Sequence, residues 1–245
     1  MKIIADMHVH TVASGHAYST VNEIALAARR RRLEAVAITD HGPALPGGPH
    51  LYHFGAMRFI PDRIFGVRVL RGAEANIIGP GGELDLPEGY LARLDFVMAG
   101  FHEGCGFDGR GLSANTDAML RAMENPRVNA VAHSGNPEFP VDLESLVKGA
   151  AATGTALEIN NSSFSMSRRG SRPNCERLVE LALLHGALLV VGSDAHIAQG
   201  VGEFGDAVAV LEKAGASPEQ VVSSSLERLL TFLGINDLFQ NDGPR

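Results

Sequence analysis

The stretch Lys2-Ile3-Ile4-Ala5-Asp6-Met7-His8-Val9-His10 starts as a short apolar run and ends in two histidines. In a β-strand, residues i and i+2 project from the same side, so we expect His8 and His10 to point together from a strand end. Two converging imidazoles form a chelating pair, and imidazole is a common ligand of zinc-like metals. Asp6 has the same parity, and we expect it to steady one ring by accepting its second N–H. The stretch therefore predicts a strand that carries a metal site.

Similar apolar segments alternate with helical patterns along the whole chain. We expect strands at residues 2–7, 35–39, 67–73, 94–100, 128–132, 156–159 and 188–192. Helical patterns fall at 21–33, 115–124, 143–153, 174–185, 206–214 and 218–232, with a break in the last. Apolar strands separated by helices indicate βα units and a mostly parallel sheet. The predicted fold class is therefore α/β.

Polar and titratable residues stand where these strands end. In chain order they are His8 and His10, Asp40 and His41, Glu74, His102, His133, Glu158 and Asn160, and Asp194 and His196. In parallel α/β folds the functional site lies at the carboxyl ends of the strands. Closing the sheet would bring all these side chains to one rim, whereas an open sheet would spread them along an edge. The pattern favours a barrel.

The composition narrows the class of protein. A chain of 245 residues fits one large α/β domain or two small ones, and no Pro/Gly/Ser-rich stretch resembles a linker. The formal net charge of −7 argues against tight nonspecific binding to nucleic acid, and the run Arg29–Arg32 is expected to be a solvated helix end. Two cysteines give no disulfide framework, and no signal peptide or membrane span is indicated. We expect a cytoplasmic protein with no membrane contact; the oligomeric state is left open.

The candidate ligands outnumber the needs of a single ion. Seven histidines join Glu74 and Asp194 to make nine ligands, whereas one ion takes three or four protein ligands. Two or three metal ions are therefore implied. Glu74 carries two oxygens and could bridge two of them. The histidines of this set are His8, His10, His16, His41, His102, His133 and His196.

On these residues the sequence resembles the PHP family, named for polymerase-associated and histidinol-phosphatase domains. The matching motifs are Asp6-Met7-His8-Val9-His10-Thr11, Ile38-Thr39-Asp40-His41, Gly72-Ala73-Glu74, Gly100-Phe101-His102, Ala132-His133 and Gly192-Ser193-Asp194-Ala195-His196. Three further stretches, at 13–20, 158–164 and 202–204, look like those of the small YcdX-type members. One departure is Ser134, where such proteins often have proline. The resemblance covers nearly the whole chain and implies one PHP domain over residues 1–245, folded as a distorted TIM-like (β/α)7 barrel.

The resemblance also implies three metal ions per chain, usually zinc, with Mn²⁺ or Fe²⁺ as other occupants. It places one ion on His8, His10, Glu74 and Asp194, and a second on Glu74, His102 and His133. The third ion would bind His16, His41 and His196. Asp40 is expected to support a ligand or cap a strand end.

Charge bookkeeping indicates the substrate class. Three divalent ions bring +6 and the carboxylates of Glu74 and Asp194 bring −2, so the site attracts hydroxide and a phosphate. We expect a phosphatase that cleaves phosphomonoesters of a small substrate with a metal-activated hydroxide. Arg168 and Arg169 are candidates for holding phosphate oxygens. Arg58 could also contact the substrate, and His53 could protonate the leaving oxygen.

Two other functions compete with this one. A phosphodiesterase or exonuclease acting on nucleotides would use the same ions, but the small acidic chain shows no nucleic-acid track. In a non-catalytic module, metals would only stabilise the fold. The complete ligand set and the absence of an attached catalytic domain argue against such a module.

Overall fold

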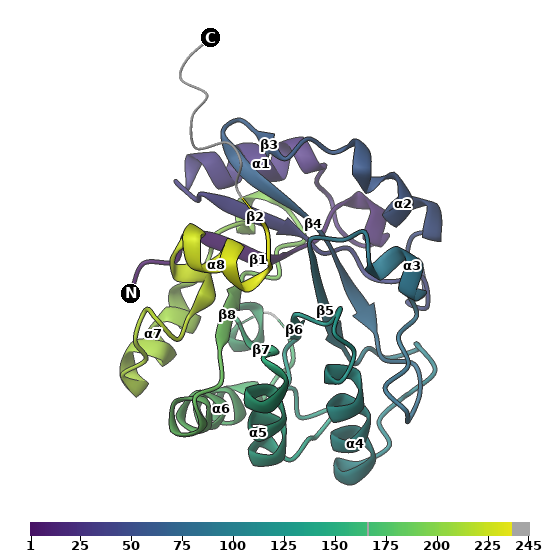
Figure 1. The fold of residues 1–245 in the computed structure, drawn as a ribbon, viewed down its shortest axis with the longest axis vertical. Coiled ribbons are helices and arrows are strands. Elements are labelled where there is room, and N and C mark those ends of the chain that lie inside the picture. The colour runs from purple at the N-terminus through teal and green to yellow at the C-terminus, as the bar shows by residue number, and fades with distance from the viewer. Residues whose placement is uncertain (166, 237–245) are drawn as a thin grey trace.

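The computed structural model describes residues 1–165 and 167–236. Within these residues, seven parallel strands form a sheet in the order β1-β2-β4-β5-β6-β7-β8, with helices around its outside (Figure 1). The short β3 pairs antiparallel with β4. The strands are β1 (Ala5–Val9), β2 (Ala35–Ile38), β3 (Arg63–Ile64), β4 (Val67–Asn76), β5 (Phe96–Gly100), β6 (Ala130–Val131), β7 (Ala156–Asn160) and β8 (Leu189–Gly192).

The sheet curls until its first and last parallel strands meet. A parallel bridge joins Val9 to Ala195, just past the end of β8. Two backbone hydrogen bonds support it: His10 N–H donates to the Ala195 carbonyl (2.9 Å) and Asp194 N–H donates to the His8 carbonyl (2.8 Å). The predicted TIM-like (β/α)7 barrel is therefore confirmed, with β1 and β8 in contact through few bonds.

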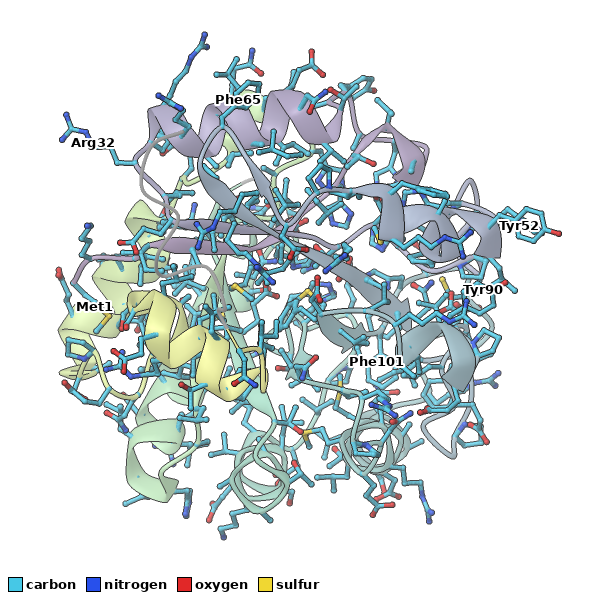
Figure 2. All side chains as sticks on the ribbon, turned by 45° about the horizontal axis from the view of Figure 1, so that its top comes forward. Met1, Arg32, Tyr52, Phe65, Tyr90 and Phe101 are labelled. Carbon is cyan, nitrogen blue, oxygen red and sulfur yellow. The ribbon has the colours of Figure 1, made fainter. Side chains whose placement is uncertain are left out.

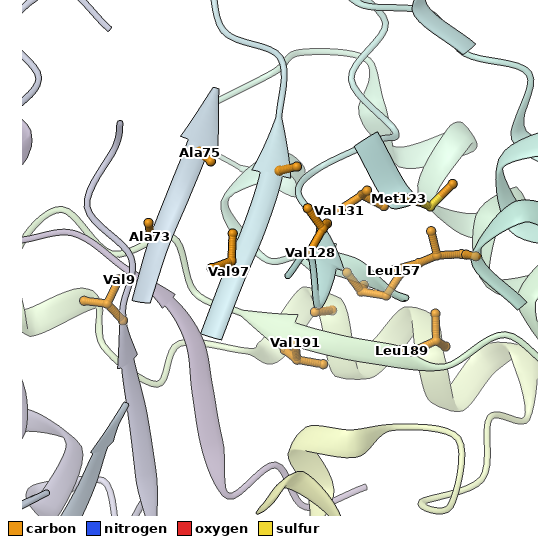
Figure 3. Packing of buried hydrophobic residues seen from close by; sticks show 14 of the residues in the cluster. Val9, Ala73, Ala75, Val97, Met123, Val128, Val131, Leu157, Leu189 and Val191 are labelled. Carbon is orange, nitrogen blue, oxygen red and sulfur yellow. The ribbon is translucent and has the colours of Figure 1, made fainter. Parts of the chain in front are cut away.

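Two apolar layers hold the barrel together. The inner layer draws residues from every parallel strand and is rich in alanine, so the barrel is narrow; it includes Ala5, Ala37, Ala130 and Ala156. The outer layer packs the other face of each strand against the helices, as Val131 and Leu157 pack near Met123 of α4 (Figure 3). This alternation follows from the two-residue period of a strand that is buried on both faces.

Helices follow most strands and cover the outer layer. They are α1 (Val21–Arg30), α2 (Leu51–Ala56), α3 (Glu88–Leu91), α4 (Leu112–Met123), α5 (Leu143–Thr153), α6 (Ser171–His185), α7 (Gly205–Ala214) and α8 (Leu226–Phe232). At the start of α1, the Thr20 and Glu23 side chains each accept a hydrogen bond from the other's backbone N–H. The same helix ends before Leu33, where the sequence pattern had placed its end, because Arg32 adopts a left-handed conformation (φ 60°).

The segment after β8 closes the amino-terminal end of the barrel. Val222 and Leu229, from a 3-10 turn and from α8, join the inner apolar layer. Ser223 accepts a hydrogen bond from Ile4 N–H at the entrance of β1 (3.0 Å). At the periphery, Tyr52 of α2 projects outward and is 76% exposed (Figure 2). None of the helices in the described part of the chain is long and apolar enough to cross a membrane.

Candidate metal centre

The candidate ligands gather at the carboxyl ends of the barrel strands because inward-facing positions lead directly into them. In β4, Leu70 of the inner layer shares its parity with Glu74 and Asn76. In the same way, Met98 leads to His102 and Val190 leads to Asp194. In β1 the pairing register shifts between Asp6 and Val9, and the His8 and His10 rings approach the same group of side chains.

Four ligand atoms lie at the spacing of a tetrahedral metal site. His8 Nε2 is 3.0 Å from His10 Nε2, 3.1 Å from Glu74 Oε2 and 3.6 Å from Asp194 Oδ1. His10 Nε2 is 3.5 Å from the same Glu74 oxygen and 3.2 Å from the same Asp194 oxygen. A tetrahedron with ligands about 2.0–2.1 Å from its centre has edges of ~3.3 Å. These residues, buried in the structure, thus surround one point at the distances that a zinc-like ion requires.

The other oxygen of Glu74 belongs to a second group. Glu74 Oε1 lies 3.1 Å from His102 Nε2 and 2.7 Å from His133 Nε2, and these two nitrogens are 3.2 Å apart. Glu74 is fully buried between the two groups. Its two oxygens therefore face different ligand sets, as they would in a carboxylate that bridges two ions.

The third predicted group is looser and closer to solvent. The His16 ring centroid lies 5.2 Å from that of His41 and 4.8 Å from that of His196. His41 is shared, because its Nδ1 lies 2.9 Å from Glu74 Oε2. In the described residues, three overlapping sets have ligand atoms within 4.8 Å of one another: His10, His41 and His196; His8, His10 and Asp194; and His41, Glu74 and His102. His41 and His10 therefore lie between neighbouring groups.

The hydrogen bonds of the rings point their free lone pairs into this cluster. Ser14 Oγ donates to Asp40 Oδ1 (2.7 Å) and accepts from His41 N–H, so His10 Nδ1 must donate to it (3.1 Å). The other rings donate from Nδ1 to oxygen atoms: His8 to Glu158 (2.7 Å), His16 to Ser14 O (2.9 Å), His102 to Asn76 (2.7 Å) and His196 to Asp194 O (3.0 Å). In all five, Nε2 remains unprotonated, the form in which imidazole binds a metal.

These donor sets fit divalent ions. With both Nδ1 atoms protonated, the facing Nε2 lone pairs of His8 and His10 make no hydrogen bond, and a cation between them would remove their repulsion. Glu74 Oε2, Asp194 Oδ1 and His41 Nδ1 are likewise buried without a hydrogen-bond partner. Burial lowers the pKa of His10 and of His133 to about 3, which keeps both rings neutral at ordinary pH. Burial also opposes charge on His8, but Glu74, Glu158 and Asp194 raise its pKa well above the ordinary value, so their field calls for positive charge there.

The two aspartates near the cluster have different partners from one another. Asp6 does not accept a ring N–H, as the sequence suggested; its carboxylate accepts from Ser193 N–H, Ser193 Oγ and Gly202 N–H, and so fastens β1 to the end of β8. The β1 register shift explains the difference, because Asp6 and His8 do not share one regular face. Asp40 accepts from Thr11 and Ser14, and these hydrogen bonds, with the His53 ring, outweigh burial and lower its pKa to about 2.

A cavity of about 840 Å³ opens over the cluster, and the sequence-predicted substrate residues lie at different distances from it. Arg168 lines this cavity and donates to Asp194 Oδ2 at 2.8 Å. Arg169 is exposed and lines a separate cavity with Phe164 and Arg172. Arg58 stacks its guanidinium over Phe59, 4.9 Å from the ring centroid, on the surface. His53 Nε2 is 3.1 Å from Asp40 Oδ2, and neither His53 nor Arg58 contributes to the cavity lining.

Two buried polar residues of β7 have contacts that the sequence interpretation did not assign. Glu158 and Asn160 were noted only as strand-end groups, yet they contact His8, His133 and Asp194. A usable signal was present, since a charged residue inside the apolar strand Ala156-Leu157-Glu158-Ile159-Asn160 is costly unless it is paired.

Comparison with known proteins agrees with this architecture. The model of the PHP domain family matches residues 6–162. The chain belongs to the PHP family. This PHP chain is 53% identical over 236 residues to a probable phosphatase of Syntrophotalea carbinolica, covering 96% of this chain and 98% of the relative. A probable phosphatase of Acetivibrio thermocellus is 47% identical over 233 residues, covering 95% and 96%.

A solved PHP-type structure shares the fold at low sequence identity. The histidinol phosphate phosphatase of Lactococcus lactis, crystallised with zinc, L-histidinol and phosphate, aligns with a TM-score of 0.59 and 18% identity. The alignment covers 87% of this chain and 94% of that one. At this identity the likeness supports the barrel fold of the PHP chain and does not extend to its substrate.

Proposed function

We propose that this PHP protein is a metal-dependent phosphatase that hydrolyses phosphomonoesters of a small substrate at a trinuclear zinc site. The observation that carries the proposal is the position of Glu74, whose two oxygens face two separate ligand groups beneath the cavity that Arg168 lines. The curated relatives named probable phosphatases, and the zinc and phosphate of the histidinol phosphate phosphatase crystal, support the same chemistry.

The ligands divide among three ions in this proposal. His8, His10, Glu74 and Asp194 would hold the first, and Glu74, His102 and His133 the second. His16, His41 and His196 would hold the third at the more exposed side. Zinc suits these nitrogen and carboxylate ligands, and Mn²⁺ or Fe²⁺ could replace it. Bound divalent ions would lower the pKa of a coordinated water to about 7 and polarise phosphoryl oxygens.

The residues of the chain supply binding, charge and orientation. Glu74 and Asp194 keep the cluster from becoming excessively positive and fix its spacing. Arg168 already points at Asp194 in the cavity and would hold a phosphate oxygen in the same region. The cavity is far larger than a phosphate group and leaves room for the organic part of the substrate. Arg169 and Arg58 would contact only a substrate that extends beyond it.

The role of His53 as proton donor remains a hypothesis of this proposal. In the structure its Nε2 is engaged with Asp40, so the ring would have to turn toward the cavity to protonate a leaving oxygen. The two cysteines are free and buried, which suits a reducing cytoplasm as the compartment.

Steady-state hydrolysis of matched aryl phosphate monoester and diester substrates tests the function. We expect a higher kcat/KM on the monoester, because its second negative charge strengthens attraction to the cluster. Dialysis against a chelator should abolish turnover, and added zinc should restore it. Faster hydrolysis of the diester would replace this proposal with a phosphodiesterase. Absence of turnover on both classes with metal bound would favour a non-catalytic module.

A further inference from the structure

We propose that Glu158 is a positioning residue shared by two metal sites: one of its oxygens fixes the tautomer of His8, and the other fixes the backbone of His133. The inference rests on the metal ligands of the proposed function, but it concerns a side chain that is not a ligand. Glu158 lies inside β7 with 1% of its surface exposed.

The neighbours of this carboxylate act as hydrogen-bond donors. Glu158 Oε1 is 2.7 Å from His8 Nδ1, and Glu158 Oε2 accepts from His133 N–H at 2.8 Å. Asn160 Nδ2 is 3.3 Å from both oxygens. The Asn160 amide cannot be reversed at no cost, because its Oδ1 accepts from Ser163 N–H at 3.0 Å. A carboxylate, which only accepts, is the side chain that satisfies all of these donors.

Each oxygen acts on a different metal group. A proton held on His8 Nδ1 leaves His8 Nε2 free to face His10, Glu74 and Asp194. His133 has a positive φ of 31°, unusual for a residue with a side chain, and the bond from its N–H holds that conformation. In this conformation His133 Nε2 reaches Glu74 Oε1. One side chain thus sets the geometry of ligands in both groups.

The surroundings of Glu158 leave room for this pair and little else. A Cβ added to Gly192 would lie 2.5 Å from Glu158 Oε1 and 2.4 Å from His8 Cβ. Glycine at this position of β8 therefore permits the approach of His8 to Glu158. Asn160 extends the arrangement, since its Nδ2 also donates to Asp194 Oδ2 at 3.2 Å.

Glu158→Gln tests the proposal because it keeps the shape and replaces one acceptor with a donor. The backbone N–H of His133 cannot accept, so the glutamine oxygen must face it and the NH2 group must face His8 Nδ1. His8 would then accept at Nδ1 and carry its proton on Nε2, the atom that faces the metal group. We expect the folded variant to bind at least one ion fewer per chain by elemental analysis. Its zinc affinity in chelator competition should fall roughly 10–100-fold.

Asp95→Asn is the matched control, because Asp95 is a largely buried carboxylate that binds Arg71 away from the cluster. It should retain wild-type metal content. If Glu158→Gln folds and binds zinc with wild-type stoichiometry and affinity, the positioning role is wrong. These readouts do not depend on turnover, so a wild-type protein that binds zinc but hydrolyses no phosphate ester would overturn the proposed function alone.

A measurement on the wild-type protein covers the case in which the variant does not fold. Nitrogen-15 NMR of the zinc-loaded, histidine-labelled protein, with His8 assigned, reports which ring nitrogen carries the proton. We expect a proton on Nδ1 of His8 and none on Nε2. A proton on Nε2 of His8 would overturn the proposal without any substitution.

Discussion

At the scale of single residues, the candidate site is built from conformations that side-chain-bearing residues rarely adopt. His133, Arg168 and Asp194 have positive φ angles of 31°, 53° and 57°. Such conformations cost on the order of 1–3 kcal/mol each and persist where surrounding contacts enforce them. Here Asp194 N–H donates to the His8 carbonyl, and the Arg168 guanidinium binds the Asp194 carboxylate. The strain lies where the ligands and the candidate phosphate-binding residue are oriented.

Arg168→Ala should lower kcat/KM on an aryl phosphomonoester roughly ten- to a hundredfold. The basis is the loss of a charge-assisted hydrogen bond to the substrate, which typically costs about 1.5–3 kcal/mol. Metal content should stay at the wild-type level, because Asn160 still donates to Asp194 Oδ2. Steady-state kinetics and elemental analysis of the same preparation check both statements.

Arg169→Ala is the matched control for that experiment. Arg169 is the next residue in the chain and carries the same charge, but it is exposed and lines a different cavity. We expect less than a threefold change in kcat/KM. Equal losses in the two variants would indicate a general effect of positive charge on this loop, and an unaffected Arg168→Ala would assign that arginine to structure.

At the scale of helices and strands, the sequence predicts elements well where burial is uniform and less well where polar side chains enter a strand. The apolar runs that become β2, β5, β7 and β8 are recognised within about one or two residues. The first strand was expected at residues 2–7 but spans Ala5–Val9, so His8 lies within it. The third was expected to end at residue 73 but continues to Asn76, because Glu74 and Asn76 are buried by partners across the barrel.

The short elements were absent from the sequence interpretation for a different reason. Helices α2 and α3 and strand β3 span six, four and two residues, too few for a periodic pattern to emerge. The candidate ligands were recognisable, since histidines and acids at strand ends carry a chemical signal. Their hydrogen-bond partners, such as Ser14 and Glu158, depend on which strands become neighbours, and no local pattern encodes that.

Helix α5 offers a test of local stability away from the site. Its N-cap, Asp142, accepts a hydrogen bond from Ser145 N–H at 2.8 Å. Asp142→Ala should destabilise the protein by about 1 kcal/mol, or ~2–4 °C in Tm for a chain of this size. Asp142→Asn keeps a capping oxygen and should recover most of the loss. Thermal unfolding followed by circular dichroism measures both, and wild-type stability of the alanine variant would show that the cap contributes nothing.

At the scale of the whole molecule, closing the sheet collects charge as well as ligands. The barrel brings two buried carboxylates, Glu74 and Asp194, to one rim with neutral imidazoles around them. Buried carboxylates are costly unless paired, and here the charges beside them are incomplete without a cation. The same contact between β1 and β8 places His8 and His10 opposite Asp194. Metal binding should therefore stabilise the closed barrel as a whole.

Removing the metal should lower both ion content and global stability. Protein purified without chelator should contain about three ions per chain, mainly zinc, by elemental analysis. After chelation, Tm should fall by roughly 5–10 °C, because free zinc at about 100 times its Kd stabilises the folded state by ~2.7 kcal/mol. Added zinc should restore the Tm, whereas magnesium, which prefers oxygen ligands, should restore little of it. A single tightly held ion with no further binding on titration would contradict the trinuclear assignment. An unchanged Tm after complete metal removal would show that the carboxylates of the closed barrel are stable without a cation.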